Sequence, residues 1–177
     1  MTVRRTCVVL SLGALLFAGS VLAQENWPSW RGADRNGVSA ATGLPESWSE
    51  TDGIVWKTAL PSWSGSSPIV WQDRIFVTTP SKSANNPAVT GRGRFLDPGG
   101  DKLLLLCVSI KDGSILWERE LDSGNALGRN GNCASPSPVT DGKHVWAVTG
   151  TGAVTALTMD GAVVWSSNLQ KLFGPIG

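Results

Sequence analysis

Residue types that build metal sites and catalytic centres are scarce in this sequence of 177 residues. It contains one histidine, three cysteines and no tyrosine. No Ser or Asp pattern around His144 indicates a triad, so we interpret it as a surface residue at the start of a strand. The histidine and the cysteines also lack the spacing of zinc ligands. We therefore identify no catalytic, metal-binding or cofactor-binding residue from these patterns.

An excess of charge of one sign is also lacking. The chain has 15 Lys and Arg against 14 Asp and Glu, and no basic cluster is visible. Nucleic-acid surfaces and membrane-surface patches both need clustered Lys and Arg. The composition thus gives no indication of a nucleic-acid partner. We expect protein partners, and small-molecule ligands are the alternative.

Long hydrophobic runs are absent except near the N-terminus. Arg4 and Arg5 precede the apolar stretch Val8–Ala18, which falls short of the ~20 residues of a membrane-spanning helix. This order, with small residues ending at Ala23, is typical of a secretory signal peptide. We expect Sec-type export, cleavage after Ala23, no membrane insertion afterwards and a periplasmic or secreted mature protein. An uncleaved membrane anchor is the alternative.

Two cysteines remain once Cys7 leaves with the signal peptide. An exported protein could pair Cys107 with Cys133 in a disulfide. Cys107, however, lies in the apolar run Leu103–Val108, where a buried free cysteine acts as a small hydrophobic residue. Cys133 lies in a polar loop, and nothing in the sequence brings the two together.

The chain contains an internal repeat, which decides how the fold is interpreted. The stretch that begins at Ser67-Pro68 recurs 70 residues later at Ser137-Pro138, each copy being followed by a second apolar run. An Asp-Gly element ending in Trp recurs after 48 residues, from Asp112–Trp117 to Asp160–Trp165. The difference of 22 residues is explained by Pro80–Asp101, which is rich in turn residues and indicates an insertion between strands.

Each unit is expected to form four short strands, because its runs are rich in β-branched and apolar residues and are punctuated by Asp-Gly. The expected strands are Ser66–Trp71, Arg74–Thr79, Lys102–Ile110 and Ile115–Glu120, then Ala134–Thr140, His144–Thr149, Ala153–Thr158 and Ala162–Ser166.

The predicted fold class is all-β: a partial β-propeller built from four-stranded antiparallel blades. A further, shortened copy of the Asp-Gly element at Asp52–Trp56 is expected to be a closing strand that completes the last blade of a circular array. The expected organisation is a signal peptide over residues 1–23, an extended segment over 24–50 and propeller blades over 51–177. We expect the chain to be a truncated, N-terminal part of a propeller.

Tryptophan is abundant, with nine residues in the chain. Trp56, Trp117 and Trp165 recur once per unit, and Gly113 and Gly161 stand four residues before the last two. A flat side chain at one place per unit is typical of packing between adjacent sheets, so we predict structural docking at these five positions. An aromatic platform for a saccharide or a quinone is the alternative.

The repeated element resembles the tryptophan-docking motif of pyrroloquinoline-quinone (PQQ) type propellers, Ala-x-Asp-x-x-Thr-Gly-x-x-x-Trp. Gly113 and Trp117 match the motif, whereas Cys107, Ser109 and Asp112 stand in place of its Ala, Asp and Thr. In the next unit the matching residues, once one residue is deleted, are Ala156, Gly161 and Trp165. Three further stretches are similar to exported PQQ-like propeller proteins of planctomycete-type bacteria: Trp27–Gly32, Asn36–Ser39 and Ala134–Gly142.

Two roles share the fold that this resemblance implies, and the fold alone does not choose between them. One is a binding scaffold, like the propeller subunit of the outer-membrane β-barrel assembly machinery. The alternative is a quinoprotein dehydrogenase that oxidises alcohols or sugars with PQQ and calcium. Those enzymes have adjacent cysteines beside the cofactor, which this chain lacks. We expect a non-catalytic scaffold module without a cofactor, with an unidentified protein partner.

Two loop segments are candidate binding sites. Gly91–Arg94 has two arginines in a long insertion, and we take this insertion as the first candidate contact surface because long loops on a rigid scaffold often carry function. Asp97–Asp101 lacks the alternating oxygen ligands of a calcium loop, so we interpret it as a turn.

Overall fold

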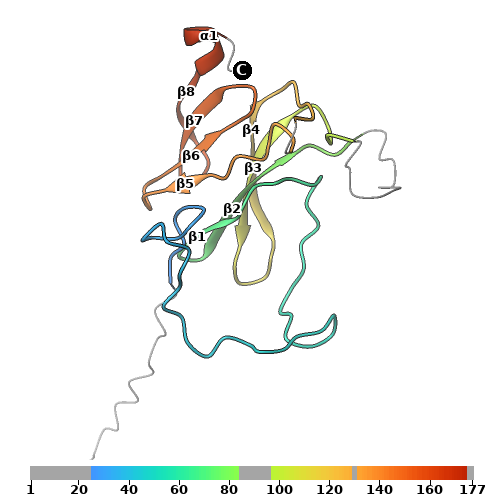
Figure 1. The fold of residues 1–177 in the computed structure, drawn as a ribbon, viewed down its shortest axis with the longest axis vertical. Helices are drawn as coiled ribbons and strands as arrows, with labels where there is room; N and C mark the ends of the chain where they lie inside the picture. Colours follow the sequence, from blue (N-terminus) through green and yellow to red (C-terminus); the bar gives the residue numbers. More distant parts are fainter. Residues whose placement is uncertain (1–24, 84–96, 129–130, 175–177) are drawn as a thin grey trace, which may run out of the picture.

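The protein forms two four-stranded antiparallel sheets that lie side by side (Figure 1). The computed structural model describes residues 25–83, 97–128 and 131–174. The strands follow one another in each sheet in chain order, so every connection within a sheet is a hairpin. The first sheet holds β1 (Ile69–Trp71), β2 (Arg74–Pro80), β3 (Leu103–Ser109) and β4 (Ile115–Asp122), and the second β5 (Val139–Thr140), β6 (His144–Val148), β7 (Ala153–Thr158) and β8 (Val163–Asn168).

The first sheet is covered on both faces. Successive side chains of a strand point to opposite faces, and β3 is buried from Leu103 to Val108. Leu105 and Cys107 pack with Phe76 toward the second sheet. Leu104 and Leu106 belong to a separate apolar cluster that Trp56 helps to cover. A near-continuous apolar run is therefore what this strand requires.

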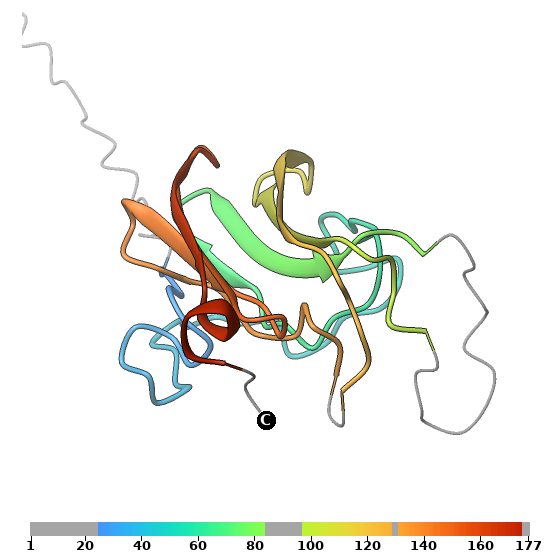
Figure 2. The ribbon, with the colours of Figure 1, turned by 90° about the horizontal axis from the view of Figure 1, so that it is seen from above.

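The second sheet packs against the first through a shared core. Val145, Ala147 and Leu157 lie in one cluster with Phe76 and Cys107 of the first sheet. Figure 2 shows the two sheets from above as neighbouring layers. A short helix, α1 (Leu169–Phe173), follows β8, and the predicted strand pattern contains no sign of it.

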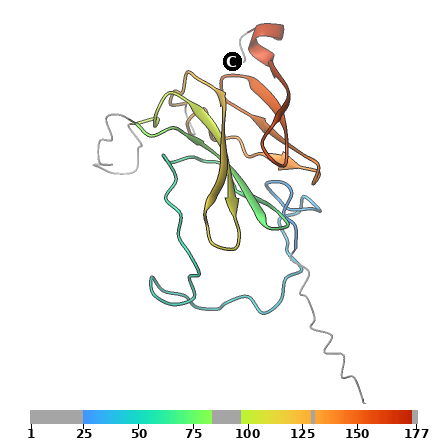
Figure 3. The same ribbon diagram turned by 180° about the vertical axis from the view of Figure 1, so that it is seen from behind.

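The N-terminal segment crosses the first strands of both sheets. Trp27 forms an isolated antiparallel bridge with Val70, in which each backbone N–H donates to the partner's carbonyl at 2.8 Å. The N–H of Thr140 donates to the carbonyl of Pro28 at 2.9 Å. Residues 38–62 then run without strands as a long loop beside the first sheet (Figure 3).

All eight expected strands are present, and two of them begin three or more residues later than expected. Strand β1 begins at Ile69 rather than Ser66, and β5 begins at Val139 rather than Ala134. Pro68, Pro136 and Pro138 have no N–H to donate, so a ladder cannot continue through them.

The segment Asp52–Trp56, expected as a closing strand, is not a strand in the structure. A strand needs a neighbour for its backbone groups, and none of the residues that the structure describes pairs with this segment. Within the same described residues, no helix is long and apolar enough to cross a membrane.

Candidate interaction surface

Trp56 lies against the hairpin that joins β3 to β4. Its indole Nε1 donates a hydrogen bond to the carbonyl of Ile110 at 2.8 Å. Gly113 in that hairpin is buried, with a φ of +72°, and a Cβ added there would come within 2.5 Å of the Trp56 ring. Only a glycine combines this left-handed backbone with so close an approach.

Trp117 repeats this arrangement one blade later. Its Nε1 donates to the carbonyl of Met159 at 3.1 Å, in the hairpin between β7 and β8. Gly161 in that hairpin has a φ of +80°, and an added Cβ would come within 2.8 Å of the Trp117 ring. The Trp117 ring also lies 5.8 Å from the ring of Phe76, between centroids. Trp56 is thus in direct contact with Gly113, and Trp117 with Gly161, which are pairings that the sequence did not predict.

A second hydrogen bond accompanies each tryptophan, from the side chain two positions further along. Thr58 Oγ1 donates to the carbonyl of Gly113 at 2.5 Å. Arg119 Nε donates to the carbonyl of Gly161 at 2.6 Å. Each glycine is therefore held from both sides: its Cα faces an indole ring, and its carbonyl accepts from the residue two positions after that tryptophan. This second contact has no repeated residue type, so the sequence did not reveal it.

Further contacts between the sheets come from Trp71 and Arg74, which no sequence pattern marks as site residues. The ring of Trp71 fills the space that a side chain on Gly142 would need. Arg74 donates through Nη1 to the carbonyl of Met159 and forms an ion pair with Asp160 at 2.9 Å. Hydrogen bonding to Asp160 raises the pKa of Arg74. The residues 70 positions after Trp71 and Arg74 are Asp141 and His144, so periodicity gave no signal.

Trp165 occupies on β8 the position that Trp117 occupies on β4, but its surroundings differ. Trp165 pairs with Ala156 across the sheet, as Trp117 pairs with Cys107. Its side chain is 46% exposed, and its neighbours Val163 and Val164 are also about half exposed. Trp165 is therefore an exposed indole at the docking position of β8.

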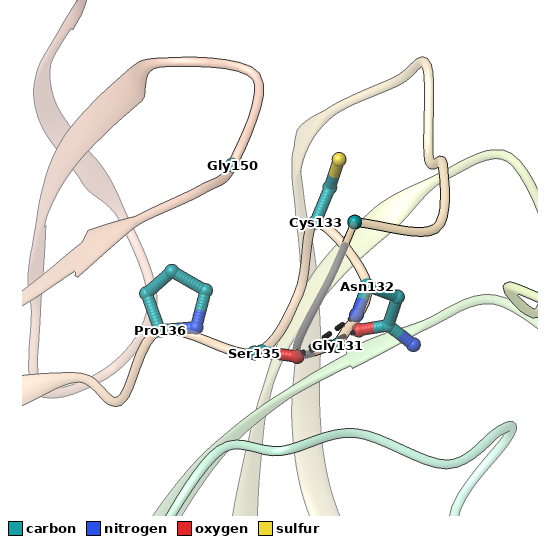
Figure 4. Close-up of a pocket in the computed structure, with 7 residues that line it drawn as sticks. Gly131, Asn132, Cys133, Ser135, Pro136 and Gly150 are labelled. Atoms are coloured by element: carbon teal, nitrogen blue, oxygen red, sulfur yellow. Dashed lines mark hydrogen bonds between the residues drawn. The ribbon is translucent and has the colours of Figure 1, made fainter. Parts of the chain in front are cut away.

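A hollow of about 440 Å³ lies near the start of the second blade (Figure 4). Its lining includes Asn132, Cys133, Ser135 and Gly150. The amide of Asn132 is fully engaged, because it donates to the carbonyls of Trp63 and Pro98 and accepts from Ala134 and Ser135. The Cys133 sulfur points away from Asn132 and Ser135. The Asn132 side chain thus connects its own loop to the loops that contain Trp63 and Pro98.

Asp112 and Asp141, which each lie in a hairpin turn, accept hydrogen bonds from groups of their own turn. Asp112 Oδ1 accepts from the N–H and the hydroxyl of Ser114, at 3.0 and 2.7 Å, which lowers the pKa of Asp112 to about 2. Asp141 Oδ1 accepts from the N–H groups of His144 and Lys143, both at 2.8 Å, and these bonds lower its pKa. These carboxylates set turn geometry.

The remaining singled-out residues lie apart from one another. His144 begins β6 and is partly exposed, as expected. Asp97 Oδ1 accepts from the N–H of Gly99 at 2.8 Å, which is a turn contact. Cys107 and Cys133 are free, so the disulfide alternative is not formed. The insertion around Gly91–Arg94 lies outside the described residues.

Two four-stranded antiparallel sheets that pack against one another, with Trp117 of the first sheet on Gly161 of the second, define a partial β-propeller. A family model matches residues 32–174, and its description is outer membrane protein assembly factor BamB. The chain belongs to this family of PQQ-like repeat propellers. No curated protein matches the chain.

Among solved structures, BamB from Moraxella catarrhalis is similar, with 13% sequence identity and a TM-score of 0.21. The match covers 67% of this chain and 56% of that one. The chain thus spans little more than half the length of that structure, and we base no function on this superposition.

Proposed function

We propose that this chain is an exported, non-catalytic binding scaffold of the PQQ-like propeller type, with a protein partner in the cell envelope. The observation that carries the proposal is the doubled docking geometry. Trp56 and Thr58 hold Gly113, and Trp117 and Arg119 hold Gly161, so the repeated aromatic residues act in assembling blades. A stack fixed in this way offers a rigid surface for binding.

The family description supports the envelope and the protein partner in this proposal, since it refers to assembly of outer-membrane proteins. The signal-like segment over residues 1–23 supports export. The exposed apolar side chains of β8 and the long loop over residues 38–62 supply surface on which another polypeptide can pack.

The dehydrogenase alternative requires a site for PQQ and calcium, and the acidic and aromatic side chains in the part of the chain that the structure describes do not fit one. Calcium needs six to eight oxygen ligands that converge. Asp112 and Asp141 instead accept hydrogen bonds from their own turns, and Asp160 pairs with Arg74. The rings of Trp56 and Trp117 already lie on glycines rather than on an open platform. No step of the proposed function therefore involves that cofactor.

Reconstitution tests the non-catalytic part of the proposal. The purified protein is incubated with calcium and PQQ, and dye reduction is followed with primary alcohols and aldoses as substrates. We expect no turnover above the protein-free control, while a known quinoprotein dehydrogenase reconstituted in parallel confirms the assay. Turnover that is lost in Asp112→Asn or Trp117→Phe would show that the chain is part of an enzyme.

A further inference from the structure

A second hollow, of about 490 Å³, lies between the N-terminal segment and the second sheet. One wall contains Trp30, Arg31 and Arg35, and the opposite wall contains Asp141 and Trp146. Ligand pockets in proteins usually measure ~300 to 1,000 Å³, so this hollow has the size of a small-molecule site. It is separate from the blade-docking contacts.

Two indoles give this hollow flat apolar faces. Trp30 is 64% exposed, and Trp146 is partly exposed. The guanidinium carbon of Arg31 lies 5.7 Å from the centroid of the Trp30 ring, so charge and aromatic surface meet at one point. A ligand that fits here has a flat apolar face and carries negative charge beside it.

The two arginines of the hollow have no acidic partner in the part of the chain that the structure describes. No carboxylate oxygen there lies within 4.0 Å of Arg31 or Arg35, and Arg31 Nη2 donates to the carbonyl of Asn36 at 3.5 Å. Guanidinium groups bind carboxylates through paired, charge-assisted hydrogen bonds. The hollow therefore suits an anionic ligand.

Asp141 adds an acceptor on the opposite wall. Its Oδ1 is engaged by the turn, and its Oδ2 lies 4.0 Å from Nδ1 of His144. Oδ2 can accept a hydrogen bond from a hydroxyl. The two walls of the hollow together offer two cations, one acceptor for a hydroxyl group and two indole faces. These groups are complementary to a sugar that carries a carboxylate.

A peptide strand is a poorer occupant, because the backbone groups beside the hollow are already paired. Trp27 exchanges two hydrogen bonds with Val70, and the N–H of Thr140 donates to the carbonyl of Pro28. Strand addition depends on free N–H and C=O groups along an edge. A ligand in this hollow is therefore bound by side chains rather than by backbone groups.

We propose that this hollow binds an anionic saccharide of the uronic-acid type. The sugar carboxylate binds Arg31 and Arg35, a ring face packs on Trp30, and a hydroxyl donates to Asp141. This site is independent of the proposed protein partner, since it uses neither the β8 surface nor the blade-docking residues.

Arg35 offers a variant that separates binding from folding. Its φ is +56°, a left-handed conformation that Asn adopts more readily than Arg. Arg35→Asn should therefore leave the melting temperature unchanged or raise it while removing one cation from the hollow. Trp30→Ala removes an exposed ring, and Lys111→Gln, in the β3–β4 hairpin, removes a cation far from the hollow as a matched control.

Isothermal titration calorimetry of the purified protein with trigalacturonate tests the proposal. Maltotriose serves as the neutral sugar, and the peptide Glu-Gly-Glu-Gly, which has three carboxylates, serves as the polypeptide probe. We expect one trigalacturonate site, an affinity at least about tenfold lower in Arg35→Asn and Trp30→Ala, and no change in Lys111→Gln. Binding should also weaken several-fold when salt rises from about 0.05 to about 0.5 M.

Four results would overturn the proposal. The first is no binding of trigalacturonate at millimolar concentration, and the second is equal affinity for maltotriose. The third is equal or tighter binding of the acidic peptide. The fourth is an unchanged affinity for trigalacturonate in both Arg35→Asn and Trp30→Ala, while the melting temperatures of these variants match that of the parent protein. The third result would assign the hollow to an acidic polypeptide segment. Dye-reduction results bear on the scaffold function alone, so the two proposals fail separately.

Discussion

The indole of Trp117 fills the space that a side chain on Gly161 would need. A Cβ built on Gly161 would lie 2.8 Å from Cδ2 of Trp117, and the φ of +80° is itself unfavourable for other residues. Two independent requirements thus meet at one position of the β7–β8 hairpin. They can be separated by substitution, because other glycines in the chain meet only one of them.

Gly161→Ala is expected to lower the free energy of unfolding by about 2 to 5 kcal/mol, combining the left-handed backbone cost with overpacking against the ring. Gly124→Ala is the matched control, since its φ is +88° and the nearest neighbour of an added Cβ lies 3.8 Å away. That control should cost about 1 kcal/mol from the backbone alone. Urea denaturation measures both, and equal losses would contradict a role for the Trp117 contact.

Replacing Trp117 or Trp165 by alanine should lower the free energy of unfolding by different amounts, because only the Trp117 ring is docked on a neighbouring blade. Trp117→Ala is expected to cost about 3 to 5 kcal/mol, because the ring packs against Phe76 and Gly161 and its Nε1 bonds Met159. Trp165→Ala, on the half-exposed β8 surface, should cost less than about 1 kcal/mol. A loss below about 1 kcal/mol in Trp117→Ala would place that ring outside the core.

Acid should destabilise the β3–β4 hairpin through Asp112. Hydrogen bonds from Ser114 hold the folded-state pKa of Asp112 at about 2, below its ordinary value of 3.8. A lowered carboxylate pKa stabilises the fold above the unfolded-state value, and this contribution is lost as pH falls from about 4 to about 2. Asp112→Asn should make unfolding free energy less steep in this range, as followed by urea titrations.

Asp34→Asn, at an exposed position in the N-terminal segment, is the control for this pH experiment. Its unfolding free energy is measured over the same pH range. An Asp112→Asn profile that superimposes on the parent profile between pH 4 and pH 2 would disprove the role of the Asp112 turn.

Thiol reactivity should distinguish the two cysteines of the blades. Burial raises the pKa of the Cys107 thiol to about 12, so thiolate is scarce at neutral pH and reagent access is blocked. Cys133 is partly exposed. Iodoacetamide at pH 8 should modify Cys133 in the native protein and Cys107 only after unfolding, as peptide mass spectrometry can show. Rapid native modification of Cys107 would mean that the core between the blades opens.

Export should remove the first 23 residues. Expression in a bacterial host, followed by intact mass measurement of the periplasmic fraction, is expected to give a chain that starts at Gln24. Ala23→Leu is expected to slow processing because signal peptidase requires a small residue there. A mature chain that keeps Arg4 and Arg5 would support the membrane-anchor alternative.

Periodicity in the sequence was sufficient to locate the strands. The 70-residue displacement of the Ser-Pro runs placed β1, β2, β5 and β6, and the Asp-Gly-to-Trp element placed β4 and β8. Such patterns work because each strand alternates its faces and each turn needs glycine or aspartate. The same repetition singled out the tryptophans and glycines of the docking contacts, but not which tryptophan lies on which glycine.

What the sequence could not predict depends on contacts that do not repeat. Trp71 against Gly142 and Arg74 with Asp160 each involve a residue whose counterpart in the other unit is of a different type. The hollow beside Trp30 is formed by segments more than 100 residues apart. Its existence depends on how the N-terminal segment lies across the second sheet, and local propensity carries no information about that.

The crossing of the N-terminal segment has a consequence for the behaviour of the chain at high concentration. Trp27 and Pro28 occupy backbone groups on the first strands of both sheets, through Val70 and Thr140. Free edge strands are templates on which other chains add, and this is how fibrils and intermolecular sheets begin. Trp27 and Pro28 thus cover backbone groups on which another chain could add, and removal of these two residues is expected to promote intermolecular sheet formation.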